Sequence, residues 1–345
     1  MDKNQANFHT LEQKLTFYNL KPVGGKGVDN IRAARKAIDY KKRNSYIEFL
    51  YILPFLLLVV AFAYFPLFGW IYSFYNYEPL KGPLFSQNYT GFKWFIDMFA
   101  TKARAEEIGQ VLKNTLAISG ISLLFSWFPM VFAVFLNEVK CKAYRKFVQT
   151  STTLPNFISW VLVYSVAFHL LYAEAGPLNQ VLKALGVIEE SINLMRDPSH
   201  MYIRMWLWLT WKNAGWAAIM YLAAIAAIDE QMIEAAKVDG ATRMKIIWHI
   251  TIPSLLPTYF VIITLNIANF LNNGMEQFYV FYNNFNEQYT QVLDLYVYNR
   301  AFPKSGTLGN FSQATAVSIM KSVVSILLLT TANLGSKLIR KESIF

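Results

Sequence analysis

The sequence predicts an all-α, polytopic membrane protein with six transmembrane helices. Of its 345 residues, 54% are hydrophobic and only 16% are charged, which is too apolar a balance for two soluble domains of this total length. Several uncharged runs exceed the roughly 20 residues that a helix needs to cross hydrocarbon. Helices are the expected form because lipid offers the backbone no hydrogen-bond partner.

The first three spans are predicted from uncharged runs at 49–77, 116–136 and 147–173. The first contains two prolines and ends in an aromatic belt that marks the outer interface. The outer segment that follows contains a short interfacial helix around Trp94 to Phe99. The short basic segment 137–146 makes the second and third spans antiparallel neighbours, and Gly176-Pro177 follows the third.

The last three spans are predicted at 202–228, 252–275 and 311–335. The fifth is uncharged, whereas the fourth contains Arg204 and Lys212 and the sixth contains Lys321. Two domains are expected: a basic N-terminal tail over residues 1–46 and a transmembrane domain over residues 47–345. The first span is expected to be retained, because a cleaved signal peptide would not follow so long a polar segment.

The formal net charge of +10 is explained by membrane topology and not by nucleic acid. Of the 32 Lys and Arg residues, 20 lie in 1–46, 137–146, 226–250 and 336–345, and 8 lie in the three alternate loops. This bias places both termini in the cytoplasm, with the cluster Lys41-Lys42-Arg43 beside the first span giving much of the signal. The single cysteine, Cys141, excludes an intrachain disulfide.

The polar segment 229–253 connects the fourth and fifth spans. Asp229-Glu230 favours a helix start, and 231–238 is predicted to be a short helix. Gly240 then ends it in the left-handed conformation that glycine adopts readily. A second short helix is expected over 241–249, with Pro253 at the start of the fifth span, where its missing N–H costs little.

The spacing of this segment resembles the cytoplasmic coupling loop of binding-protein-dependent ABC importer permeases. The pattern consists of Glu234-Ala235-Ala236, Asp239-Gly240, Ile250 and Pro253. In that role the two alanines let another surface approach the backbone, and Glu234 offers a carboxylate to a partner's cation. The alternative is an ordinary amphipathic connector, but this combination of residues between two spans favours the coupling role.

The resemblance extends over about residues 45–337 and is similar to the oligosaccharide and polysaccharide branch of these permeases. It rests on the stretches 64–69, 211–216, 221–229, 239–242, 249–254, 274–277 and 314–317. One departure is Ile252, where leucine is commoner. The resemblance implies the type I importer permease fold in a bacterial cytoplasmic (inner) membrane, importing a carbohydrate. It also implies a second homologous permease, two ATP-binding subunits that hold ATP and magnesium, and an external solute-binding lipoprotein.

Polar residues inside the spans are candidates for the translocation pathway, because such residues are costly in lipid. They are Lys212 with Asn213, the helical stripe Asn266, Asn269 and Asn273, Glu276 at the outer end of the fifth span, and Lys321. Amides suit carbohydrate hydroxyls, but they also bond helix to helix. The lysines could instead neutralise polar groups of neighbouring helices, Lys212 could snorkel outward, and Glu276 could simply be solvated.

Two other classes of function fit less well. A membrane enzyme such as a glycosyltransferase would need an acidic site, and the acids at 229–239 already fit the coupling pattern. A secondary transporter usually shows repeat symmetry and more spans. Paired carboxylates, a nucleophile elbow and a metal cluster are all missing from the sequence pattern, so no catalytic residue, metal site or resident cofactor is expected.

Overall fold

A computed structural model describes residues 46–171, 176–191, 199–303, 306 and 308–340 of the chain, with side chains up to residue 335. The expected basic tail therefore lies outside the described residues except for Tyr46. The chain divides into two compact units, Met1–Trp70 and Ile71–Phe345. The all-α prediction is confirmed: the described part contains no strand, only an isolated β-bridge between Tyr75 and Tyr89.

The first predicted span is helical over Tyr46–Phe74, and its residues up to Trp70 belong to the first unit. The helix changes geometry near Pro66, passing from a π-helical turn, η1 (Val60–Tyr64), to a 3₁₀ segment, η2 (Phe65–Phe74). Proline has no N–H to offer the preceding turn, and its ring crowds that turn's carbonyl. The altered winding just before and around Pro66 is the expected response.

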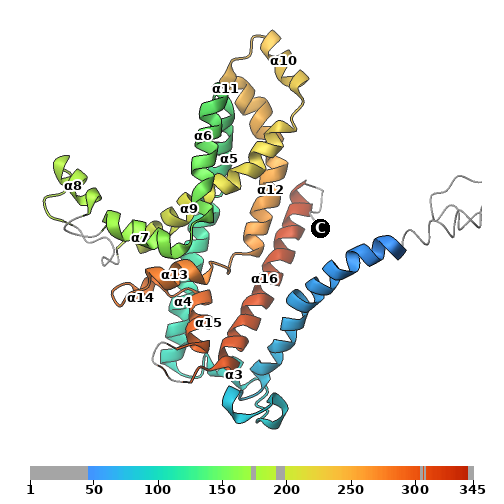
Figure 1. Ribbon diagram of the computed structural model, residues 1–345, viewed down its shortest axis with the longest axis vertical. Helices are drawn as coiled ribbons and strands as arrows, with labels where there is room; N and C mark the ends of the chain where they lie inside the picture. The colour runs from blue at the N-terminus through green and yellow to red at the C-terminus, as the bar shows by residue number, and fades with distance from the viewer. Residues whose placement is uncertain (1–45, 172–175, 192–198, 304–305, 307, 341–345) are drawn as a thin grey trace, which may run out of the picture. The chain divides into compact units, whose positions relative to one another are not determined.

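The described part of the second unit consists of helices and the turns and loops between them (Figure 1). Between the first two spans lie η3 (Pro79–Lys81), η4 (Leu84–Ser86) and α3 (Lys93–Asp97), the last confirming that a short helix forms near Trp94. Next along the chain are α4 (Lys102–Leu124), α5 (Phe128–Glu138), α6 (Lys142–Thr153), η5 (Leu154–Phe157), α7 (Trp160–Leu171), α8 (Pro177–Ala184) and α9 (Met201–Ala226). The remainder are α10 (Glu230–Val238), α11 (Arg243–Ile246), η6 (Ile247–Thr251), α12 (Ile252–Ala268), α13 (Met275–Phe281), α14 (Glu287–Thr290), α15 (Leu293–Ala301) and α16 (Phe311–Arg340).

Four helical runs in the described chain are long and apolar enough to cross a membrane, and the number rises to six if each of two bent pairs is one span. The third predicted span, 147–173, is not one straight helix. Its two parts, Lys142–Phe157 and Trp160–Leu171, meet at an angle of 107°. Pro155 lies in the 3₁₀ turn before the break, and proline there disfavours continuation of the α-helix.

The fifth span begins earlier and ends earlier than 252–275. Its helix is continuous over Arg243–Ala268, so the second short helix predicted at 241–249 forms its first turns. The π-helical turn η6 ends two residues before Pro253, and its wider winding accommodates a residue that cannot donate a hydrogen bond. The helix stops at Ala268, because Asn269 takes a non-helical conformation.

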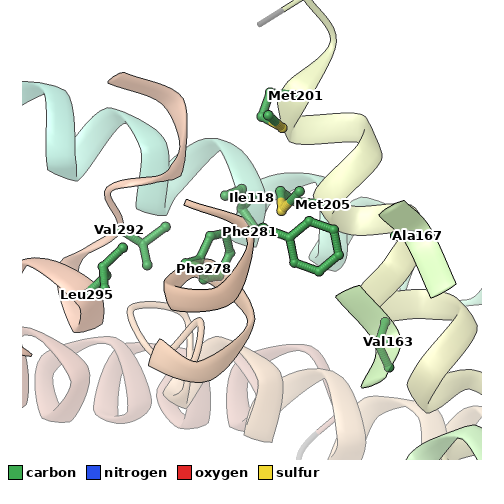
Figure 2. Close-up of a cluster of buried hydrophobic side chains, with 9 residues drawn as sticks. All are labelled: Ile118, Val163, Ala167, Met201, Met205, Phe278, Phe281, Val292 and Leu295. Atoms are coloured by element: carbon green, nitrogen blue, oxygen red, sulfur yellow. The ribbon is translucent and has the colours of Figure 1, made fainter. Parts of the chain in front are cut away.

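Three hydrophobic clusters hold the second unit together. One, shown in Figure 2, joins side chains of α4, α7, α9, α13 and the start of α15, and includes Ile118, Val163, Met205 and Phe278. A second joins α3, α4, α15 and α16, and a third joins α5, α9 and α12. The helices α4, α9 and α15 each contribute to two clusters and so connect them.

Gly215 lets α6 approach α9 at the point where the two helices cross. A Cβ atom at Gly215 would collide with the backbone of Thr152 and Thr153. Because backbone atoms cannot move aside as a flexible side chain can, a residue without a side chain is required here.

Candidate functional site

A polar hollow of about 220 Å³ lies where α4, α9 and the end of α12 meet. It is lined by Ser119, Ser122, Leu123, Leu209, Asn266, Asn269, Phe270, Asn272 and Asn273. All three asparagines of the predicted stripe therefore border one space, joined by Asn272 and two serines. Every polar side chain in this lining is an amide or a hydroxyl, and none of the described lining residues is charged.

One of the asparagines that line the hollow lies in a helix, and the others lie in the turn that follows it. Only Asn266 lies within α12, since the helix ends two residues later. The Nδ2 of Asn269 donates to the carbonyl of Leu265 at 3.0 Å, and the Nδ2 of Asn272 donates to Oδ1 of Asn269 at 3.0 Å. These residues form the turn 269–274, so the predicted continuous helical stripe is wrong in geometry although its members do converge.

Asp294, which the sequence pattern did not single out, fastens this turn. One carboxylate oxygen, Oδ2, accepts from the backbone N–H groups of Asn273 and Gly274, each at 3.0 Å. The other oxygen, Oδ1, pairs with Nζ of Lys321 from α16. The signal that could have found Asp294 is Lys321 itself, because a lysine within a span requires a compensating partner.

Ser119 anchors the same turn from α4. The Nδ2 of Asn273 donates to Oγ of Ser119 at 2.8 Å, and that hydroxyl donates to the carbonyl of Phe270. The turn is therefore bonded to residues of α4 and α15 and, through Asp294, to α16. Lys321 neutralises the carboxylate of Asp294. This is the alternative to a pathway role that the sequence analysis gave for this lysine.

Lys212 is also bonded to other groups of the protein. Its side chain is buried, and its Nζ donates to the carbonyls of Pro155, Asn156 and Ile158 at 3.2, 2.7 and 2.7 Å. These carbonyls lie at the break between α6 and α7, where a helix end leaves acceptors without partners. A cation suits this place because carbonyl groups concentrate partial negative charge at a helix C-terminus.

Asn213, next to Lys212, bonds to the same break. Its Oδ1 accepts from Nδ2 of Asn156 at 2.9 Å, and its own Nδ2 donates to the carbonyl of Leu209 at 3.0 Å. Neither Lys212 nor Asn213 lines the polar hollow. Glu276 lies apart from it too, exposed in the first turn of α13.

The segment 229–253 forms the short helix α10, a tight turn and the first turns of the helix Arg243–Ala268, at one end of the second unit in Figure 1. The carboxylate of Asp229 caps α10 by accepting from the N–H of Gln231 at 2.9 Å. At the other end, the N–H of Ala241 bonds to the carbonyl of Ala236 at 2.9 Å and that of Gly240 to Lys237 at 3.1 Å. This pair of bonds is a Schellman motif, and Gly240 has the left-handed φ of +75° that it requires.

The surface of this segment is open. Glu234, Ala235 and Asp239 are exposed, and α10 has no buried residue. Large apolar side chains are exposed beside them, with Val238 at 88% and Trp248 at 61%. Ile250 is partly buried and Pro253 is exposed on the continuous helix that follows. Exposed apolar residues gathered around a polar loop are typical of a protein–protein contact.

Comparison with known proteins identifies the chain. The family described as "binding-protein-dependent transport system inner membrane component" matches residues 126–341. The chain belongs to this family. The predicted resemblance is therefore confirmed, and the protein is a transmembrane permease subunit of an ABC importer, with the importer permease fold.

Two curated relatives of this permease come from Bacillus subtilis (strain 168). Protein LplB is 34% identical over 324 residues, which are 94% of the permease and 96% of LplB. The polygalacturonan/rhamnogalacturonan transport system permease protein YteP is 36% identical over 298 residues, 86% of the permease and 89% of YteP.

A solved structure shows the same fold. A chain in the crystal structure of a bacterial alginate ABC transporter, in complex with an alginate pentasaccharide-bound periplasmic protein, superposes with a TM-score of 0.75. It is 30% identical to the permease, and the match covers 88% of the permease and 98% of that chain. The family is a transport component, and among the described residues of the permease there is no group of three or more His, Cys, Asp or Glu that could hold a metal ion.

Proposed function

We propose that the permease imports an oligosaccharide, and that the polar hollow is part of the path that the sugar takes. The observation that supports this most strongly is the lining itself. Four asparagines and two serines surround a space of about 220 Å³. Amide and hydroxyl groups both donate and accept hydrogen bonds, which matches the hydroxyls of a sugar ring.

The relatives support a carbohydrate as the substrate. YteP is named for polygalacturonan and rhamnogalacturonan transport, and the structural neighbour belongs to an importer of alginate. Those substrates are acidic, but the hollow in this permease offers no cation, because Lys212 and Lys321 are both engaged by protein oxygens. The hollow therefore binds hydroxyls, and recognition of any carboxylate takes place elsewhere in the importer.

The second part of the proposal concerns the partners. Segment 229–253 is the coupling loop: it binds one of two ATP-binding subunits, which hold ATP and magnesium, through Glu234 and the exposed surface beside it. A second homologous permease completes the channel, and an external solute-binding lipoprotein delivers the sugar. This arrangement places the loop and both chain termini in the cytoplasm of the bacterial cell.

The test is uptake by the complete importer in lipid vesicles, with radiolabelled oligogalacturonide, rhamnogalacturonan fragments, alginate pentasaccharide and arabino-oligosaccharide as probes. We expect uptake of at least one probe only when ATP is supplied on the membrane face where a membrane-impermeant thiol reagent labels Cys141. Asn269→Leu and Asn272→Leu should each lower uptake of that probe about five- to tenfold while assembly is unchanged, as expected for losing about 1–1.5 kcal/mol in a hydrogen-bonding site.

Two results would contradict the proposal. Uptake of none of these sugars, with uptake of a peptide or an inorganic ion instead, would exclude the carbohydrate class. Unchanged uptake by both asparagine variants would remove the hollow from the path. The exposed Lys113→Met on α4 is the control for a general effect of substitution in these helices.

A further inference from the structure

The turn 269–274 is held by two side chains from distant parts of the chain, Ser119 and Asp294, and only Asp294 binds its backbone N–H groups. Its last two residues, Asn273 and Gly274, present adjacent backbone N–H groups to Oδ2 of Asp294. Gly274 has a φ of +78°, so this pair of amides is aimed by a conformation that most residues adopt at a cost. A carboxylate that accepts two N–H groups at once fixes both their positions and their directions.

Both oxygens of Asp294 are used. Besides the two amides on Oδ2, Oδ1 pairs with Nζ of Lys321, and the two side chains are only 20% and 14% exposed. Partial burial strengthens these bonds relative to a surface ion pair, and it also makes either charge costly if its partner is removed. Asp294 therefore joins α15, α16 and the turn, and Lys321 contributes the positive charge that pairs with its carboxylate.

We propose that Asp294 is a positioning residue for import: it holds the turn 269–274 so that Asn269 and Asn272 face the sugar in the polar hollow, with Lys321 as its counter-charge. This inference rests on the proposed role of the hollow. Asp294 itself does not line the hollow, so it acts through the turn and not by touching the sugar. The asparagines would then owe their orientation to a carboxylate on a different helix, 20 residues further along the chain from Gly274.

The experiment separates a positioning role from simple charge balance. The complete importer is assayed with the transported probe found above, using Asp294→Ala, Lys321→Met and the double variant. Positioning predicts that Asp294→Ala raises the half-saturating sugar concentration about tenfold, the equivalent of one lost charged hydrogen bond. Lys321→Met should have the smaller effect, because the two amides still hold the carboxylate. The defect should persist in the double variant, which has no unpaired charge.

A second measurement does not depend on transport. Hydrogen exchange of the amides of Asn273 and Gly274 in the assembled complex should be faster in Asp294→Ala and in the double variant, and close to wild type in Lys321→Met. The matched control is Glu107→Gln, which breaks the 2.5 Å ion pair with Arg300 of the same helix, α15, without touching the turn. It should change neither exchange in the turn nor the half-saturating concentration.

Recovery of wild-type uptake and exchange in the double variant would overturn the positioning role and leave a charge-balancing pair. If Asp294→Ala speeds exchange in the turn but uptake is unchanged, the turn is held as inferred but it does not serve the sugar, and the positioning role fails. Failure of the hollow itself is recognised separately, because Asn269→Leu and Asn272→Leu would then also leave uptake unchanged.

Discussion

The coupling loop and the turn beside the polar hollow are stabilised in opposite ways. Within 229–253, each described hydrogen bond joins residues no more than five positions apart, as in Asp229 with Gln231 and Ala241 with Ala236. The turn 269–274 instead depends on Asp294, 21 positions beyond Asn273, and on Ser119, 154 positions before it. One segment is folded by its neighbours in sequence, the other by neighbours in space.

This difference fits the role that we propose for each segment. A locally folded loop keeps its shape while all of its outer surface is offered to a partner, as the exposed Glu234 and Val238 show. A hollow between helices must instead fix side chains from several helices relative to one another. Buried charged side chains do this, because leaving either partner unpaired is costly and so only one packing arrangement satisfies them.

The largest expected effect comes from Lys212, whose hydrogen bonds, like those of Asp294, join parts of the chain that are distant in sequence. Lys212→Met removes the donor that serves three carbonyls at the break between α6 and α7. The Pro155 carbonyl keeps the N–H of Ile158, so the part-buried carbonyls of Asn156 and Ile158 are the ones left without this donor. We expect a loss of about 3 kcal/mol or more in the free energy of unfolding, since each orphaned buried group costs about 1–3 kcal/mol. Thermal unfolding in detergent measures it.

The control for Lys212→Met is Lys113→Met, which changes an exposed lysine on α4 and should alter stability by about 0.5 kcal/mol or less. Equal stability of the two variants would mean that the break between α6 and α7 does not need its lysine. The dependence on distant contacts would then be confined to the turn 269–274.

A smaller effect is expected from Gly240→Val in the coupling loop. Nothing lies within 4 Å of a Cβ at this position, so the cost comes from the left-handed φ of +75° alone and amounts to about 1–2 kcal/mol. Because the strain is local, we expect the helices to remain packed while the loop loses the shape that its partner binds. Uptake and ATP hydrolysis by the reconstituted importer measure the loss.

Gly240→Asn is the matched variant, because asparagine tolerates the left-handed conformation better than other residues do. It should retain most of the uptake that Gly240→Val loses. Equal activity of the two variants would show that the conformation at residue 240 is not what the partner recognises.

The smallest effect should follow from Asp229→Ala. The substitution removes the cap on α10, and caps of this kind contribute about 1 kcal/mol. Because α10 has no buried residue, we expect that loss to appear as faster amide exchange in the first turn of α10 and not as a change in global unfolding. Asp229→Asn should retain the cap; a global loss of stability in Asp229→Ala would mean that the loop is not folded locally.

The sequence by itself determined the features that depend on composition and on short spacing. The apolar runs predicted the all-α membrane fold because lipid requires satisfied backbone groups. The spacing within 229–253 predicted the short helix α10 and the turn at Gly240, since caps and a left-handed glycine act over a few residues. The same spacing indicated the family that the comparisons confirm.

Only the tertiary structure decided what the charged and amide side chains within the spans contact. Lys212 and Lys321 were visible as costly residues, but their partners lie on other elements: the carbonyls around Asn156 and the carboxylate of Asp294. The early end of α12 at Ala268 also changed a predicted helical stripe into a turn. Periodicity describes which residues share a face of one helix, whereas the oxygen that satisfies a buried cation depends on how the helices pack, which is a property of the whole fold.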